Sequence, residues 1–163
     1  MNYKIEIFHK DGVFDAEGEK VKSDIRDLGI SGIKKVKTEQ LYIINGNLTD
    51  KEIETVCKEL LIDSVVQEYR IVDSPKMGRS QTITSHTQTE SDIYSIEVFY
   101  KKGVTDAVGE STLKAIKDMG IENVNSVRTG RKYLLIGSLA ESDLGKIATR
   151  ILANTVVQEY KIS

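Results

Sequence analysis

The side chains that could do chemistry in this sequence are four carboxylates, which stand in two copies of one motif. Asp15 and Glu19 follow a Gly-Val pair, and Asp106 and Glu110 repeat them at an offset of 91 residues. Carboxylates at this spacing could serve as general acid and base, or as ligands of a metal ion. No histidine or cysteine stands beside either pair to complete such a site. The favoured interpretation is a helix N-cap followed by a first-turn acid that the helix dipole stabilises.

Histidine and cysteine offer little for catalysis. His9 has Tyr100 at the equivalent place in the second copy, and His86 lies outside both copies, so neither belongs to a duplicated site. Cys57 is the only cysteine and its counterpart is Ala148, which indicates a small buried side chain rather than a nucleophile. A single cysteine also excludes a disulfide framework and fits a reducing compartment. We therefore predict no catalytic residue, no metal site and no cofactor.

Phosphate and nucleic acid are poor ligands for this sequence. Gly12 and Gly18 lack the spacing and the Lys-Ser/Thr pair of a phosphate-binding loop. Lys and Arg number 23 against 25 Asp and Glu, a net charge of −2, whereas a nucleic-acid-binding domain is expected to be basic. Aromatic residues that recur in strands could stack on bases, but burial between the repeats is the favoured interpretation; they are Phe8, Phe99, Tyr42 and Tyr133.

The elements that carry these residues come from one unit written twice. Residues 3–71 align with residues 94–162 without a gap, and the longest shared run is Val-Val-Gln-Glu-Tyr at 65–69 and 156–160. Internal repetition decides the architecture before any other feature does. Since a module of about 70 residues buries only about 60 % of its unfolded surface, two such modules would gain stability by packing together.

The duplication predicts two domains and a connection. We expect a first unit at 1–71, a linker at 72–91 and a second unit at 92–163. The linker is rich in Ser, Thr and Gln, has no apolar period and holds the only proline, Pro75. The chain has no run of about 18 apolar residues, so we expect a cytoplasmic protein that does not enter a membrane.

Each unit reads β-α-β-β-α-β, the ferredoxin-like order of an α+β fold. In the first copy the elements are a strand at 3–10, a helix from the Asp15 cap to about Leu28, two strands around a turn at 38–40, a helix opened by a Thr49-x-x-Glu52 capping box, and a strand at 65–71. In the second copy the turn falls at 129–131, and Ser138 with Glu141 forms the capping pair.

A four-stranded sheet with both helices on one face leaves its other face uncovered. Apolar side chains expected on that other face are Phe8, Tyr42, Ile44, Phe99, Tyr133 and Leu135. An apolar face of this size normally marks an interface. We therefore expect the two units to pack their sheets together or to exchange an edge strand, forming a pseudo-dimer within one chain, with further homo-dimerisation open to it.

Four motifs follow one another along the chain. They are Lys-x-Gly-Val-x-Asp-x-x-Gly-Glu at 10–19 and, with Lys101, in the second copy; a helix ending in Leu/Met-Gly-Ile; Val-x-x-Gly-x-x-Tyr at 127–133; and Leu-Ala-Asn-x-Val-Val-x-x-Tyr at 152–160. In this order they resemble the PurS family, the small subunit of phosphoribosylformylglycinamidine synthase. The first copy departs from them with Glu39 for the glycine and Ile62-Asp63 for Ala-Asn. Because ordinary members hold one unit and dimerise, the chain is similar to a linked PurS dimer.

The resemblance implies a non-catalytic role in purine synthesis. It implies partners, the glutaminase (PurQ) and the ATP-dependent synthetase (PurL), between which PurS assists ammonia transfer. We expect the exposed repeated groups and the 128–132 hairpin to contact them: Lys10, Gly12, Asp15, Glu19, Lys101, Gly103, Asp106, Glu110, Arg128, Arg131 and Lys132. The competing hypothesis is an amino-acid-binding regulatory module of the ACT type, which has the same order of elements, and a generic oligomerising adaptor is a third.

Overall fold

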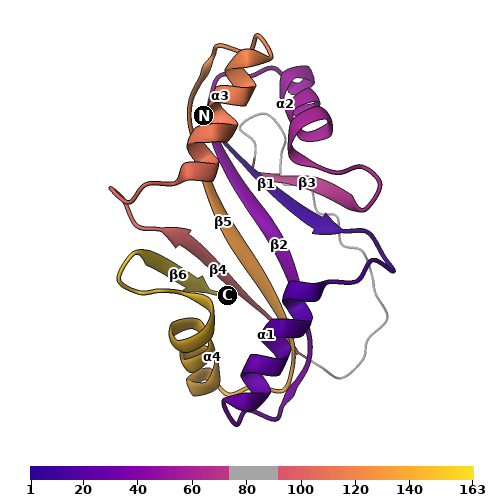
Figure 1. Cartoon of the computed structure of the whole chain (residues 1–163), viewed down its shortest axis with the longest axis vertical. Helices are drawn as coiled ribbons and strands as arrows, with labels where there is room; N and C mark the ends of the chain where they lie inside the picture. The colour runs from indigo at the N-terminus through magenta and orange to yellow at the C-terminus, as the bar shows by residue number, and fades with distance from the viewer. Residues whose placement is uncertain (74–91) are drawn as a thin grey trace. The chain divides into compact units, whose positions relative to one another are not determined.

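The computed structural model describes residues 1–73 and 92–163 of the chain, so nearly all of the predicted linker lies outside the described residues. In the first repeat the elements are β1 (Asn2–His9), α1 (Ala16–Asp27), β2 (Ile33–Gly46), α2 (Asp50–Val56), the π-helix η1 (Cys57–Leu61) and β3 (Gln67–Asp73) (Figure 1). In the second they are β4 (Asp92–Tyr100), α3 (Ala107–Asp118), β5 (Val124–Gly137), α4 (Glu141–Ile147), the π-helix η2 (Ala148–Leu152) and β6 (Gln158–Ile162).

The described residues form two compact units, and each unit combines segments of both repeats. Unit 1 contains residues 1–13, 39–73 and 105–130, and unit 2 contains residues 14–38, 92–104 and 131–163. Helix α3 of the second repeat therefore belongs to the unit of β1 and β3, while helix α1 of the first repeat belongs to the unit of β4 and β6. The long strands β2 and β5 each contribute one half to either unit.

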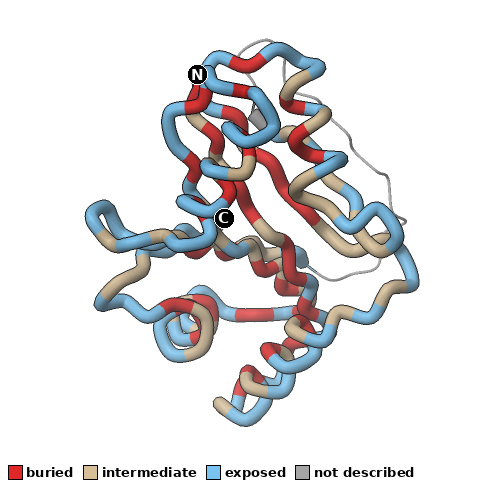
Figure 2. The backbone as a smooth tube through the Cα atoms, turned by 45° about the horizontal axis from the view of Figure 1, so that its top comes forward, coloured by how far each residue is buried: buried red, intermediate tan, exposed pale blue. Residues whose placement is uncertain are grey.

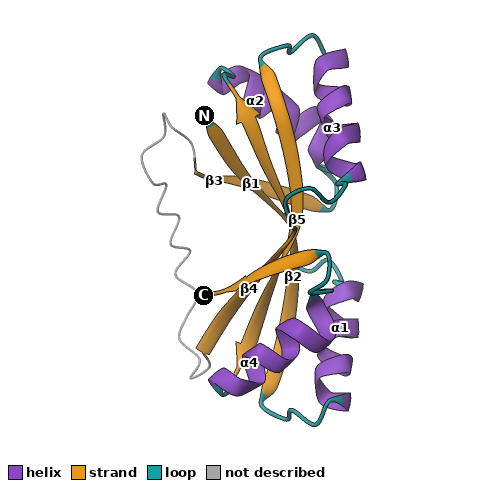
Figure 3. Ribbon diagram, turned by 90° about the vertical axis from the view of Figure 1, so that its left-hand side faces the viewer, coloured by secondary structure: helices purple, strands orange, loops and turns teal. Residues whose placement is uncertain are grey.

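Within each unit the strands and helices have the ferredoxin-like arrangement. The strand order is β3-β1-β2-β5 in unit 1 and β6-β4-β5-β2 in unit 2, and β1 runs antiparallel to both β2 and β3. Figure 3 shows both helices of each unit on one face of its strands. The prediction of an α+β chain with two ferredoxin-like units is confirmed. Of the two expected arrangements the structure has the exchange, and a helix is exchanged together with the edge strand.

The predicted hairpins at 38–40 and 129–131 are wrong, because β2 and β5 run straight through both positions. A tight two-residue hairpin needs residues with positive φ. Among the described residues only Gly12, Gly29, Gly103, Gly120 and Gly137 have positive φ, so Gly130 is not used as a turn residue. Where we predicted two short strands, each repeat has one long strand that carries the chain from one unit into the other.

The core of unit 1 lies between its strands and the helices α2 and α3. Buried residues are concentrated in the strands and on one side of each helix (Figure 2). Its members are Tyr3, Ile5, Ile7, Tyr42, Ile44, Leu48, Ile53, Val56 and Cys57 of the first repeat, with Ile116, Ile121, Val124 and Val127 of the second. The expectation that Tyr42 and Ile44 face away from the helices is wrong. Tyr42 pairs with Ile5 and Ile44 with Tyr3, and directly opposed residues share a face.

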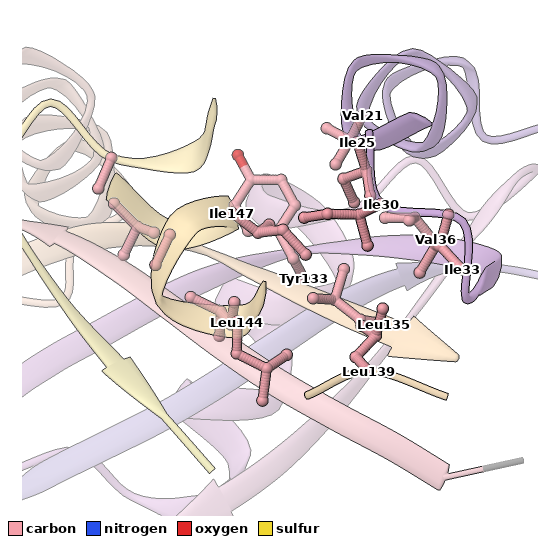
Figure 4. Packing of buried hydrophobic residues seen from close by; sticks show 14 residues of the cluster. Val21, Ile25, Ile30, Ile33, Val36, Tyr133, Leu135, Leu139, Leu144 and Ile147 are labelled. Atoms are coloured by element: carbon pink, nitrogen blue, oxygen red, sulfur yellow. The ribbon is translucent and has the colours of Figure 1, made fainter. Parts of the chain in front are cut away.

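The core of unit 2 also combines both repeats, with α1 from the first repeat and β4, β5 and α4 from the second. Val21 and Ile25 of α1 belong to one buried cluster with Tyr133 and Leu135 of β5 and Ile147 of α4 (Figure 4). Tyr133 and Leu135 were also expected on the helix-free face, and this too is wrong because both are buried in this cluster. Phe8 and Phe99 do lie on the opposite face, since they alternate with the buried residues of their strands.

The second helix of each repeat begins at an equivalent position but is capped by different residues. Thr49 and Glu52 form the predicted capping box of α2: the Glu52 amide donates to Thr49 Oγ1 (3.2 Å) and the Thr49 amide to Glu52 Oε2 (2.7 Å). The pair predicted from Ser138 is wrong, because α4 starts later and has Ala140 as N-cap, whose amide donates to Asp143 Oδ2 (3.1 Å).

A repeated glycine allows the exchanged helix to approach the strand. A methyl group on Gly18 would collide with the backbone oxygen of Val36, and one on Gly109 would meet the oxygen of Val127. Both contacts are with backbone, which cannot move aside as a flexible side chain can. These glycines are therefore required by packing within the units.

We expect Gly18→Ala to destabilise the protein by about 1–3 kcal/mol, the usual effect of overpacking. Gly145→Ala is the matched control, because an added methyl group there meets nothing within 4 Å. In the middle of a helix alanine should stabilise by about 0.5–1 kcal/mol relative to glycine. Urea unfolding of both variants measures the difference, and equal effects at the two positions would contradict the close approach of α1.

Candidate functional site

The structure does not gather the repeated motif into one site. Lys10 and Gly12 belong to unit 1, whereas Asp15 and Glu19 belong to unit 2, and the second copy is divided at the corresponding place. The first part of the motif is a turn that leaves β1, where Gly12 has φ +82°. The second part is the N-terminus of α1. The motif thus marks the point at which the chain passes from one unit into the other.

Asp15 ties α1 to β2, and the predicted N-cap is confirmed. Its carboxylate accepts hydrogen bonds from the amide of Gly18 (2.8 Å), the amide of Thr38 (2.7 Å) and the Thr38 hydroxyl (2.9 Å). Charge-assisted bonds of this kind are among the stronger ones in proteins. A carboxylate so occupied serves structure, which argues against an acid-base role for Asp15. Thr38 was missed by sequence reasoning, although its recurrence as Thr129 was a usable signal.

Asp106 makes the same connection between α3 and β5. It accepts from the amide of Gly109 (2.9 Å), the amide of Thr129 (2.6 Å) and the Thr129 hydroxyl (2.8 Å). Its first-turn neighbour Glu110 is exposed, as is Glu19 in α1. The four carboxylates of the motif therefore comprise two half-buried helix caps, Asp15 and Asp106, and two exposed acids, Glu19 and Glu110.

The basic candidates lie on exposed parts of both units. Lys10 donates from Nζ to the Ser64 carbonyl oxygen (2.6 Å), and its counterpart Lys101 is exposed. Arg128 is exposed in unit 1, and Lys132 is half-buried in unit 2. Gly103 has φ +86°, close to the +82° of its counterpart Gly12. These positions leave the candidates distributed over the surface of both units.

Arg131 forms a small cluster with the exchanged helix α1. Its Nη1 donates to Glu17 Oε2 (2.7 Å), and the Tyr133 hydroxyl donates to Glu17 Oε1 (3.4 Å). Burial, with a smaller contribution from the Glu17 carboxylate, raises the pKa of Tyr133 to about 12. The phenol therefore stays protonated at neutral pH and can donate. The cluster joins residues of the two repeats inside unit 2.

A second cluster, which sequence reasoning missed, occupies the helix-free face of unit 1. Arg70 donates from Nε to Glu6 and from Nη2 to Glu39 (2.7 Å), and its guanidinium lies 4.7 Å from the centre of the Phe8 ring. Glu6 and Glu39 are only 2 % and 5 % exposed. Burial lowers the pKa of Arg70, but the two carboxylates outweigh it and the net shift is upward. The second repeat has Lys161 and Gly130 in place of Arg70 and Glu39.

The remaining candidates for chemistry are Cys57 and the residue types that bind metal ions. Burial raises the pKa of the Cys57 thiol to about 12, so this side chain is a protonated core residue. No group of three or more His, Cys, Asp or Glu residues in 1–73 and 92–163 is arranged to hold a metal ion. In the same ranges no helix has the length and apolar character needed to cross a membrane.

Unit 1 also has a shallow hollow of about 370 Å³ beside α2. Its lining residues are Thr49, Lys51, Glu52, Thr55 and Glu59, with Met119 and Ile121. Glu52 is already engaged in the capping box. The second repeat has Ala140 and Lys146 in place of Thr49 and Thr55, so the hollow's chemistry is not duplicated.

Comparison with known proteins identifies the family. The subunit PurS of phosphoribosylformylglycinamidine synthase from Archaeoglobus fulgidus is 37 % identical over 77 residues, which cover 44 % of this chain and 92 % of that protein. The Methanocaldococcus jannaschii subunit is 33 % identical over 67 residues, covering 38 % of this chain and 81 % of the relative. A crystal form of B. subtilis PurS is 24 % identical with a TM-score of 0.41, covering 44 % of this chain and 94 % of the other.

The family model described as PurS, phosphoribosylformylglycinamidine (FGAM) synthase, matches the chain twice, at residues 2–74 and 93–163. The two matches correspond to the two repeats. The chain therefore belongs to the PurS family and carries two copies of its unit.

Proposed function

We propose that this chain is the non-catalytic PurS subunit of a cytoplasmic FGAM synthase, joining the glutaminase (PurQ) to the synthetase (PurL) and assisting ammonia transfer between them. The observation that carries the proposal is the match of the family to both repeats. The carboxylates that could have supplied acid-base chemistry support it as well, because Asp15 and Asp106 are occupied as caps.

The exchange of segments supports a further part of the proposal, that one chain takes the place of two PurS subunits. Unit 1 needs α3 and half of β5 from the second repeat, and unit 2 needs α1 and half of β2 from the first. A chain with a single repeat could complete the same unit only by taking these segments from a second copy. Linking the repeats makes that association intramolecular and independent of protein concentration.

Shielded transfer has a chemical reason. Ammonia released into water at neutral pH is protonated to ammonium, which has no lone pair and cannot attack an activated amide. A subunit that holds glutaminase and synthetase together is then needed for turnover driven by glutamine. It is not needed when a high concentration of ammonium salt supplies ammonia to the synthetase directly.

The decisive reconstitution mixes the chain with the glutaminase and synthetase from the same organism. We expect FGAM formation from glutamine to require the chain, and FGAM formation from ammonium salt to proceed without it. Product formed from each nitrogen source, with and without the chain, is the measurement. Glutamine-driven turnover that is the same in both cases would contradict the proposal. Stabilisation of the isolated chain by amino acids in a thermal shift would instead favour the regulatory-module hypothesis.

We expect Arg128→Ala and Arg131→Ala each to lower the affinity for the synthetase by about 5-fold to 30-fold, which corresponds to a loss of about 1–2 kcal/mol at an interface. Weaker co-elution of each variant with the synthetase is the measurement. The guanidinium is suited to this role because its planar group can donate two parallel hydrogen bonds to one carboxylate. Melting temperatures should change little, since the Arg131–Glu17 pair is 46 % and 39 % exposed and a surface pair contributes little.

Glu17→Gln is the matched control for Arg131→Ala. It removes the same ion pair within unit 2 but keeps the guanidinium. Binding that is retained in Glu17→Gln and lost in Arg131→Ala would assign the contact to the arginine. Equal losses would show that the ion pair acts through the fold, and unchanged co-elution of both arginine variants would remove these residues from the interface.

A further inference from the structure

The two most exposed large apolar side chains among residues 1–73 and 92–163 occupy the same position in the two repeats. Val65 is 77 % exposed and Val156 is 80 % exposed. The next most exposed, Phe14 at 74 %, has the polar residue Thr105 at its place in the other repeat. Both valines belong to the longest run shared by the repeats. Among the residues that the structure describes, no other large apolar side chain is exposed at equivalent positions of both repeats.

Neither valine is kept by the needs of the core. They lie outside both buried clusters, and the last strand of each repeat begins only at Gln67 and Gln158, not at 65 and 156 as the apolar pattern suggested. A side chain with this exposure gains almost nothing from folding, because hydrophobic stabilisation scales with the area removed from water. The valines would gain it only by docking.

The backbone around each valine is held by one repeated set of hydrogen bonds. In unit 1 the Val65 amide donates to Asp63 Oδ1 (3.0 Å), and the Asp63 amide donates to Gln67 Oε1 (2.9 Å). In unit 2 the Val156 amide donates to Asn154 Oδ1 (3.2 Å), and the Asn154 amide donates to the equivalent glutamine (2.8 Å). A turn fixed in this way, carrying a β-branched side chain with little rotamer freedom, loses little entropy on binding.

In each unit a second turn, which begins with a lysine, is hydrogen-bonded to the turn that carries the valine. The Lys10 amide donates to the Val66 carbonyl (2.9 Å), and its Nζ lies 2.6 Å from the Ser64 oxygen, so the ammonium group is held over the turn. The Lys101 amide donates to the Val157 carbonyl in the same way (2.9 Å). We call the turns 10–13 and 63–67 of unit 1, and 101–104 and 154–158 of unit 2, the two-turn platforms.

We propose that the two-turn platforms are docking points that insert Val65 and Val156 into apolar sockets bordered by carboxylates on a protein partner. The apolar tip selects the socket, and in unit 1 the Lys10 ammonium group held over the turn selects the acidic border. Because the platforms share the valine and the backbone hydrogen bonds around it, the apolar socket is the same at both, either on two copies of one subunit or on a subunit with two equivalent sockets. The inference rests on the proposed function, in which this partner is a subunit of the synthase.

The test compares Val65→Ser with Val156→Ser, singly and together, for binding to immobilised synthetase and glutaminase subunits. Losing the burial of one valine should weaken binding to one of the two subunits by about 10-fold to 100-fold, and the double variant should bind more weakly still. Phe14→Thr is the control, because it removes an equally exposed apolar group that is not repeated. It should bind as the unchanged chain does, and all variants should keep the melting temperature.

The outcomes separate this inference from the function on which it rests. If the unchanged chain binds neither subunit, the proposed function fails and this inference fails with it. If it binds, and the serine variants bind equally well, the platforms are not docking points while the proposed function stands. If the serine substitutions change only the sedimentation coefficient of the chain alone, the sockets belong to further copies of the chain, which also overturns the inference.

Discussion

The absence of a turn in the middle of β2 and β5 is the constraint on which the rest of the structure depends. Each strand stays extended through the residues where a hairpin would reverse the chain, and neither Gly130 nor any described residue beside it takes the positive φ of a tight turn. A chain that cannot reverse there must deliver the preceding helix and half-strand to the other unit. The carboxylates of Asp15 and Asp106 hold the delivered helices by bonding to Thr38 and Thr129.

The exchange decides where stability comes from. Ile25 and Ile116, the fully buried residues of the exchanged helices, each lie in a cluster that combines residues of both repeats. Truncating a buried isoleucine to alanine typically costs about 2–5 kcal/mol, a large part of the stability of a small domain. Each of the two cores is therefore built from residues of both repeats. The linked chain is a physical unit, which agrees with the proposal that it stands in for two subunits.

Periodicity and capping residues predicted most of the helices and strands, but not the path of the long strands or the face on which their side chains lie. The helices, the Asp15 cap and the Thr49 capping box could be predicted because they depend on interactions between residues close in sequence. Tyr42 and Ile44 were placed on the wrong face because a strand has a period of two, so an assumed hairpin misplaces every side chain beyond it. Thr38 and the Arg70 cluster depend on contacts between residues far apart in sequence, which no local pattern contains. For the two-turn platforms, the sequence shows the shared run at 65–69, but only the structure shows that Val65 is exposed.

Methyl-methyl nuclear Overhauser effects in the intact chain test the exchange most directly. If α1 is exchanged, the Ile25 methyl groups should give cross-peaks to methyl groups of the second repeat in the same core of unit 2, among them Leu135 and Ile147. If each repeat folded on itself instead, Ile25 would show cross-peaks to Ile44 and Val56 of its own repeat. That second pattern would disprove the exchange, whereas the first could not arise in one chain without it.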